Sequence, residues 1–131
     1  MGLVRYLVDT CTFIWLALPQ GKLSKAATTA LNDPASELYF SDMSAWEICL
    51  KHSAGKLLLP DVPRQWLPSR MAFYQISPLP VTHDVIYRSG ELPRGHRDPF
   101  DRFLAAQTIA ASLTIISPDT PLSQLGASRI W

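Results

Sequence analysis

Four short segments of the chain each carry a carboxylate beside an apolar run or inside a structured pattern. They lie at residues 7–10, 44–47, 98–102 and 116–119. Several carboxylates within a few ångströms of one another cannot all ionise without compensating positive charge, so such a cluster needs cations. Divalent cations such as Mg²⁺ bind carboxylate oxygens, and a bound ion activates water for attack on phosphate esters. The pattern therefore predicts a metal-dependent enzyme that acts on phosphodiesters.

The spacing of apolar residues predicts the elements that position these carboxylates. Strands are expected at 3–8, 37–40, 113–116 and 128–131, with a weaker extended segment at 75–80. Helical spacing covers 10–18, 24–31, 43–52, 64–73, 82–89 and 98–112, with a helical turn at 121–125. Ser24, Asp42, Thr82 and Asp98 are the expected N-caps.

Strands that alternate with helices predict an α/β fold with a mostly parallel central sheet. In such sheets, sites form outside the carboxyl ends of the strands. Asp9 ends the first strand and Asp119 follows the strand at 113–116, so both should face one crevice. The 131 residues, 47% of them hydrophobic, fit a single domain spanning residues 1–131.

Asp9 and Glu47 each have an ordinary structural explanation beside the functional one. Asp9 is a suitable N-cap for the helix that follows, but capping uses one carboxylate oxygen and leaves the other for a cation. Glu47 can pair with Lys51 four residues later. Alternatively, Glu47 is held at the rim of the core to bind a cation, because it shares a helix face with Met43 and Leu50.

The remaining acids are weighed in the same way. Asp98 before Pro99 is typical of an N-cap followed by the first helical residue, so capping and metal binding both stay open. Asp101 suits the first helical turn, but it also begins a row of residues expected to pack, which favours a ligand. Asp119 lies between two prolines and is either a turn former or a ligand.

Composition limits the partners and the compartment. The net charge of +1 does not predict a polyanion partner, so nucleic-acid binding would depend on local patches. Cys11 and Cys49 lack metal-ligand spacing and are expected to be reduced thiols in the core. Neither a leader segment nor a membrane span is expected, which favours a cytoplasmic protein.

The order of the motifs resembles the PIN-domain family, and within it the VapC-type toxins of bacterial toxin–antitoxin pairs. The resemblance spans residues 3–131. It is carried by Asp9-Thr10, by Ser-Ala-Trp-Glu-Ile at 44–48, by His-Arg-Asp-Pro-Phe-Asp-Arg-Phe-Leu-Ala-Ala-Gln at 96–107, and by Asp119. The block at 98–107 and the Trp46-Glu47 pair are its most specific parts.

The resemblance implies a PIN-like three-layer fold and a Mg²⁺- or Mn²⁺-dependent endoribonuclease that forms a homodimer and is neutralised by a cognate antitoxin. By motif position, the catalytic and metal-binding acids are Asp9, Glu47, Asp101 and Asp119, and Asp98 is a further candidate metal ligand. Many relatives have Thr shortly before the last acid. Here Ser117 and Pro118 precede it, and Ser117 can still supply a hydroxyl.

Other residues of these motifs have supporting roles in this interpretation. Thr10 and Ser44 are candidates to orient ligands or waters. Basic residues that flank the acids are candidates for contacts with RNA phosphates: Lys51, His52, Arg97 and Arg102. Apolar surfaces at 13–18 and 66–73 would serve either dimer or antitoxin contacts, or the core.

Two alternatives remain at the level of the sequence. The first is a catalytically silent PIN-like module that binds RNA or protein, against which the intact acids argue. The second is a phosphatase of the haloacid-dehalogenase type, which would need an Asp two residues after Asp9, where this chain has Cys11. A glycine-rich phosphate loop is absent from the sequence, which argues against a P-loop nucleotidase.

Overall fold

The computed structural model describes residues 3–131, so Met1 and Gly2 of the expected 1–131 domain lie outside the described residues. Its central layer is a five-stranded sheet of order β3-β2-β1-β4-β5, in which every neighbouring pair is parallel. The strands are β1 (Val4–Val8), β2 (Ser36–Ser41), β3 (Ile76–Leu79), β4 (Thr114–Ile116) and β5 (Arg129–Ile130). The predicted three-layer α/β fold with a parallel sheet is confirmed.

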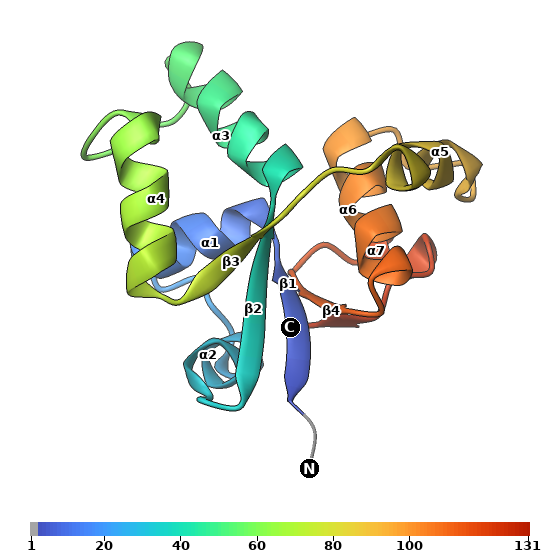
Figure 1. Cartoon of the computed structure of the whole chain (residues 1–131), viewed down its shortest axis with the longest axis horizontal. Coiled ribbons are helices and arrows are strands. Elements are labelled where there is room, and N and C mark those ends of the chain that lie inside the picture. Colours follow the sequence, from blue (N-terminus) through green and yellow to red (C-terminus); the bar gives the residue numbers. More distant parts are fainter. Residues whose placement is uncertain (1–2) are drawn as a thin grey trace.

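Helices cover both faces of this sheet. They are α1 (Thr10–Ala17), α2 (Lys25–Asn32), α3 (Asp42–Ser53), α4 (Pro63–Phe73), α5 (His83–Glu91), α6 (Pro99–Ala110) and α7 (Pro121–Gln124). Figure 1 shows α1, α2 and α4 on one side of the sheet and α5, α6 and α7 on the other, with α3 rising from the end of β2. Among the described residues, no helix combines the length and apolarity needed to cross a bilayer.

The sheet separates two main hydrophobic cores. Because successive side chains of a strand point to opposite faces, Val8 and Ile116 pack with α1–α4, whereas Leu7 and Ile115 pack with α6 and α7. All four side chains are fully buried. Burial on both faces explains why β1 and β4 appear as nearly continuous apolar runs in the sequence.

The N-caps are mostly as predicted, with one correction. Ser24 and Thr82 accept hydrogen bonds from the backbone N–H groups of Ala27 and Val85. Asp42 is not a cap, because the Ser41 hydroxyl accepts the N–H of Met43 at 3.0 Å. Ser41 is both the last residue of β2 and the cap of α3, so Asp42 becomes the first helical residue, where negative charge is also favoured.

Two other predictions about buried surfaces need correction. Cys49 is exposed rather than in the core, and Cys11 is only partly buried. Neither thiol forms a disulfide in the part of the chain that the structure describes. Phe13 and Trp66 belong to the core, so the segments 13–18 and 66–73 contribute mainly to packing, although Phe73 is exposed.

Candidate metal centre

Parallel pairing brings two strand ends to the same edge of the sheet. Val8 of β1 is in register with Ile116 of β4, so Asp9 and Ser117 follow the strands at the same level. The ladder continues for one more step, because the N–H of Asp9 donates to the carbonyl of Ile116 at 3.3 Å. The predicted meeting of Asp9 and the segment of Asp119 at the same edge of the sheet is therefore observed.

Asp9 is held in a dehydrated setting by neutral donors. Its side chain is almost completely buried. One carboxylate oxygen, Oδ1, accepts the N–H of Thr10 at 2.7 Å and caps α1. The other, Oδ2, accepts the hydroxyl of Ser117 at 2.5 Å. The same hydroxyl accepts the N–H of Asp119 at 3.0 Å, so Ser117 links the two acids and fixes Asp119 despite Pro118.

The environment of Asp9 opposes its negative charge. Burial raises the pKa of the Asp9 carboxyl from 3.8 to about 6, although the hydrogen bond from Ser117 opposes this change. The negative charges of Asp119 and Asp101 raise that pKa further, and the N–H of Thr10 lowers it. A nearby cation would reverse the balance by favouring the ionised carboxylate.

Cys11 is the one member of this cluster that the sequence did not predict. Ligand atoms of Asp9, Cys11 and Asp119 lie within 4.8 Å of one another. Burial, followed by the charges of Asp9 and Asp119, strongly raises the pKa of the Cys11 thiol, which stays protonated and lies 3.6 Å from Asp9 Oδ2. The effective donors are then carboxylate oxygens, which suit hard ions such as Mg²⁺ or Mn²⁺ better than thiophilic ones.

Asp101 and Asp98 lie at the start of α6. Asp101 Oδ2 is 2.8 Å from Nε2 of His96, a partner that sequence reasoning missed because it lies in a loop rather than at helical spacing. Burial raises the pKa of Asp101, His96 lowers it by hydrogen bonding, and the charges of Asp98 and Asp119 raise it. Asp98 is exposed, and its Oδ1 accepts the N–H groups of Phe100 and Asp101 as a cap.

Glu47 pairs with Lys51, the structural explanation considered from the sequence. The ammonium lies 2.6 Å from Glu47 Oε2, and the Glu47 side chain is only 12% exposed. Partial burial lowers the pKa of Lys51, but the hydrogen bond to Glu47 and the negative charges of Glu47 and Asp98 outweigh it and raise the pKa. One turn earlier, the hydroxyl of Ser44 accepts a hydrogen bond from the hydroxyl of Thr10 at 2.8 Å, which ties α3 to the start of α1.

The predicted acids thus form two sets rather than one cluster. Ligand atoms of Asp9 and Asp119 lie within 4.8 Å of each other. In the described part of the chain, Glu47, Asp98 and Asp101 bring no ligand atom into a group this close. Each of these three has one oxygen engaged, by Lys51, by backbone N–H groups and by His96 respectively. Within residues 3–131, their other oxygens accept no hydrogen bond from the protein, which leaves them open to water.

Arg102 has a different role from the one predicted. Its guanidinium donates to the carbonyl groups of Ser89, Leu92, Pro93 and His96 at 2.8–3.2 Å. Arg102 therefore holds the loop before α6 in place, and the prediction that it binds RNA phosphates is not supported. Arg97 is exposed and forms no ion pair within residues 3–131.

Comparisons with known proteins agree with this architecture. One similar structure is VapBC2 from Rickettsia felis bound to a DNA fragment from their promoter, with a TM-score of 0.66 and 14% identity over 98% of this chain and 99% of that one. A second is FitAcB from Neisseria gonorrhoeae, with a TM-score of 0.63 and 19% identity over 96% of each chain. A third is VapBC-5 from Mycobacterium tuberculosis, with a TM-score of 0.60 and 20% identity over 97% of this chain and 96% of that one.

The sequence itself gives a more direct assignment. No curated protein matches the chain significantly. The family model described as "PIN domain" matches residues 6–127, which include all the candidate acids and nearly the whole chain. The chain belongs to the PIN domain family.

Proposed function

We propose that the protein is a metal-dependent endoribonuclease that acts as the toxin of a toxin–antitoxin pair. The observation that carries this proposal is the pair of acids at the carboxyl edge of the sheet, Asp9 and Asp119, joined by the Ser117 hydroxyl. Such a pair, in a PIN-domain chain, is suited to hold a divalent ion.

Asp9 and Asp119 would hold Mg²⁺ or Mn²⁺ directly, and the free oxygens of Glu47, Asp98 and Asp101 would accept hydrogen bonds from surrounding waters. A divalent ion bound there supplies charge stabilisation for the phosphate and an acidified water. The chain's own contribution is to fix geometry. Ser117 sets the distance between the two acids, and His96 fixes the orientation of Asp101.

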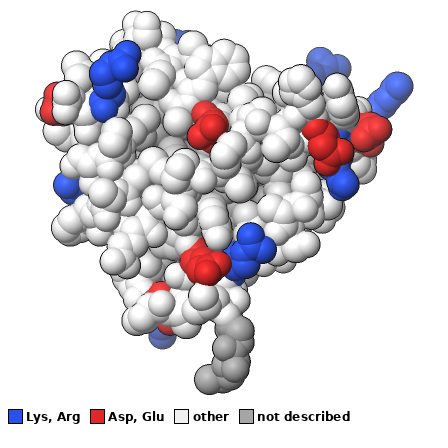
Figure 2. Space-filling model, in the orientation of Figure 1, with Lys and Arg blue, Asp and Glu red and all other residues white. Residues whose placement is uncertain are grey.

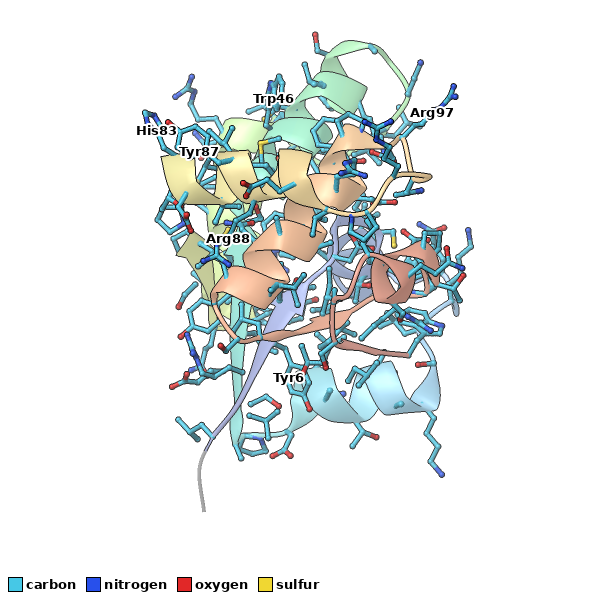
Figure 3. All side chains as sticks on the ribbon, turned by 90° about the vertical axis from the view of Figure 1, so that its right-hand side faces the viewer. Tyr6, Trp46, His83, Tyr87, Arg88 and Arg97 are labelled. Atoms are coloured by element: carbon cyan, nitrogen blue, oxygen red, sulfur yellow. The ribbon has the colours of Figure 1, made fainter. Side chains whose placement is uncertain are left out.

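The RNA would bind beside the acids through a small number of exposed groups. Trp46 is 53% exposed and packs edge-to-face against Phe100, with ring centroids 5.6 Å apart, so its outer face is open to stack on a base. Arg97, next to Asp98, is a candidate for a phosphate contact. Figure 3 shows both in the upper part of the molecule, with Trp46 near the middle of the view and Arg97 at its right-hand side. The face in Figure 2 has few charges and no continuous basic surface, which favours local contacts.

An antitoxin is the proposed protein partner, and its proposed binding site is the apolar groove between α3 and α4. This groove has a volume of about 810 Å³ and includes Ala45, Cys49, Leu67 and Met71. Ala45 and Cys49 lie two residues before and after Glu47 on α3, so the groove is on a different face of this helix from Glu47. The expected homodimer stays a proposal, to be tested by the mass of the protein in solution.

RNA cleavage by the purified protein tests the enzymatic part of the proposal. Cleavage of structured RNA should require Mg²⁺ or Mn²⁺ and stop with a chelator. Asp9→Asn and Asp101→Asn should each lower the rate by at least about 100-fold with the fold retained. Asp84→Asn is the matched control, because Asp84 lies in an exposed ion pair with Arg88 on α5.

Three outcomes would contradict this function. Cleavage that survives chelation would exclude the metal mechanism, and cleavage that survives both site substitutions would exclude the assigned acids. RNA binding without cleavage at any metal concentration would favour the silent-module alternative. For the partner, co-expression with a small protein encoded directly upstream should yield a stable, inactive complex, and Met71→Glu in the groove should weaken it.

A further inference from the structure

Lys51 occupies the side of the acidic site that the sheet edge does not reach. It lies on α3 one turn after Glu47, and Ser44, which contacts Thr10, lies one turn before Glu47 on the same helix face. The ammonium of Lys51 contacts Glu47 Oε2 at 2.6 Å. The negative charge of Asp98, the N-cap of α6, also acts on Lys51. The ammonium therefore lies beside acids of α3 and of the start of α6.

Its setting differs from that of an ordinary surface ion pair. Exposed Lys–Glu pairs are usually worth little, because water competes with both partners. Here the Glu47 side chain is only 12% exposed, although half of the Lys51 side chain remains in contact with solvent. A carboxylate so enclosed needs a cation close by. Lys51 supplies that cation permanently, with no ion taken from solution.

We propose that Lys51 is a positioning residue that fixes Glu47 and takes the place of a second divalent ion, so that the site binds one ion, at Asp9 and Asp119. This inference rests on the proposed function, since it assumes that the two sheet-edge acids bind a divalent ion. It adds the number of ions and a reason for it. The ammonium neutralises the side of the site formed by α3 and α6, and the divalent ion neutralises the sheet edge.

Mn²⁺ binding tests the inference without reference to activity. The free Mn²⁺ signal in electron paramagnetic resonance gives the number of ions bound per chain. The wild-type protein should bind one ion. Lys51→Met removes the ammonium and leaves Glu47 and Asp98 uncompensated, so this variant should bind two. Lys51→Arg keeps the positive charge and should bind one.

A double variant and a fold control complete the design. Glu47→Gln combined with Lys51→Met should return the number of ions to one, because the carboxylate that would hold the second ion is gone. Circular dichroism checks that each variant is folded. Two ions in the wild type, or one ion in both the wild type and Lys51→Met, would overturn the inference and leave the proposed function intact. No ion in the wild type would overturn both.

Discussion

The acids at the sheet edge and those on the helices are neutralised in opposite ways. Asp9 has a hydroxyl, a thiol and a backbone N–H around it, all of them neutral groups. Glu47 instead has the ammonium of Lys51 at 2.6 Å, and Asp101 has Nε2 of His96 at 2.8 Å. Neutral donors can orient a carboxylate but do not cancel its charge, whereas the ammonium of Lys51 does both for Glu47. The sheet edge is therefore the part of the site that lacks a counter-charge from the protein.

This difference assigns separate tasks to the two regions. The strands bring their acids together through pairing register, which is rigid and buried. The helices present acids whose partners lie one helical turn or one loop away. Under the proposed function, a divalent ion would be needed only at the first region. The two regions should then respond differently to the same kind of change.

The largest expected effect is on the stability of the metal-free protein. Because the folded-state pKa of Asp9 is raised to about 6 from 3.8, the folded protein holds this proton more tightly than the unfolded chain. The stability that this proton contributes is fully present below the unfolded-state pKa, about 4, and is lost as the pH rises through about 6. In chelator at pH 7.5, Asp9→Asn should increase the free energy of unfolding by up to about 3 kcal/mol.

Thermal and urea unfolding at pH 4 and pH 7.5 measure this effect. Asn is an equally good N-cap, so helix capping does not confound the comparison. The gain should shrink to about 0.5 kcal/mol at pH 4, where Asp9 is protonated in the folded state and about half protonated in the unfolded chain. Asp101→Asn should raise the free energy of unfolding less, because Asp101 is less buried than Asp9 and is hydrogen-bonded to His96. A gain of equal size at both pH values would contradict the electrostatic explanation.

Ser117→Ala should have the next largest effect, on metal affinity. It removes the hydroxyl that donates to Asp9 and accepts from Asp119, and the loss of such a supporting contact typically weakens metal binding about 10–100-fold. Ser117→Thr keeps the hydroxyl and should bind almost normally. Calorimetric titration with Mn²⁺ measures both, and an unchanged affinity in the Ala variant would show that Ser117 does not organise the site.

The smallest effect is expected at Asp98. Asp98→Ala removes the N-cap of α6 and should cost about 1 kcal/mol of unfolding free energy. Asp98→Asn keeps the cap, so its free energy of unfolding should be within about 0.5 kcal/mol of the wild-type value. Both variants should still bind one Mn²⁺. If the Asn variant, stable but without the charge, loses the ion, Asp98 is a metal ligand rather than only a cap.

The sequence predicted the fold well because its signals are local and strong. The apolar runs of β1 and β4 mark strands buried on both faces, and caps such as Ser24 and Thr82 mark where helices begin. Asp9 and Asp119 could be placed together because parallel strands end at one edge. The one misplaced cap, Asp42, shows the limit, since two neighbouring polar residues were both suitable and only the backbone geometry selects Ser41.

The partners of the acids were harder to predict. Lys51 was recognised as a possible partner of Glu47 because it lies at helical spacing. His96 and Cys11 were not recognised, because their proximity depends on a loop and on the burial around the first turn of α1. Arg102 was assigned to RNA for its charge, although its five hydrogen bonds go to carbonyl groups of the chain itself. Such contacts depend on tertiary geometry that charge and spacing do not encode.

The hydrogen bonds of Arg102 also have a consequence for the order in which the site assembles. The loop at 92–98 has no strand or helix to order it, and four carbonyl groups in or near it depend on one side chain of α6. The loop cannot reach its final shape until the first turn of that helix exists. Loop and helix start therefore form one cooperative folding unit, and His96 becomes a partner for Asp101 only when that unit closes.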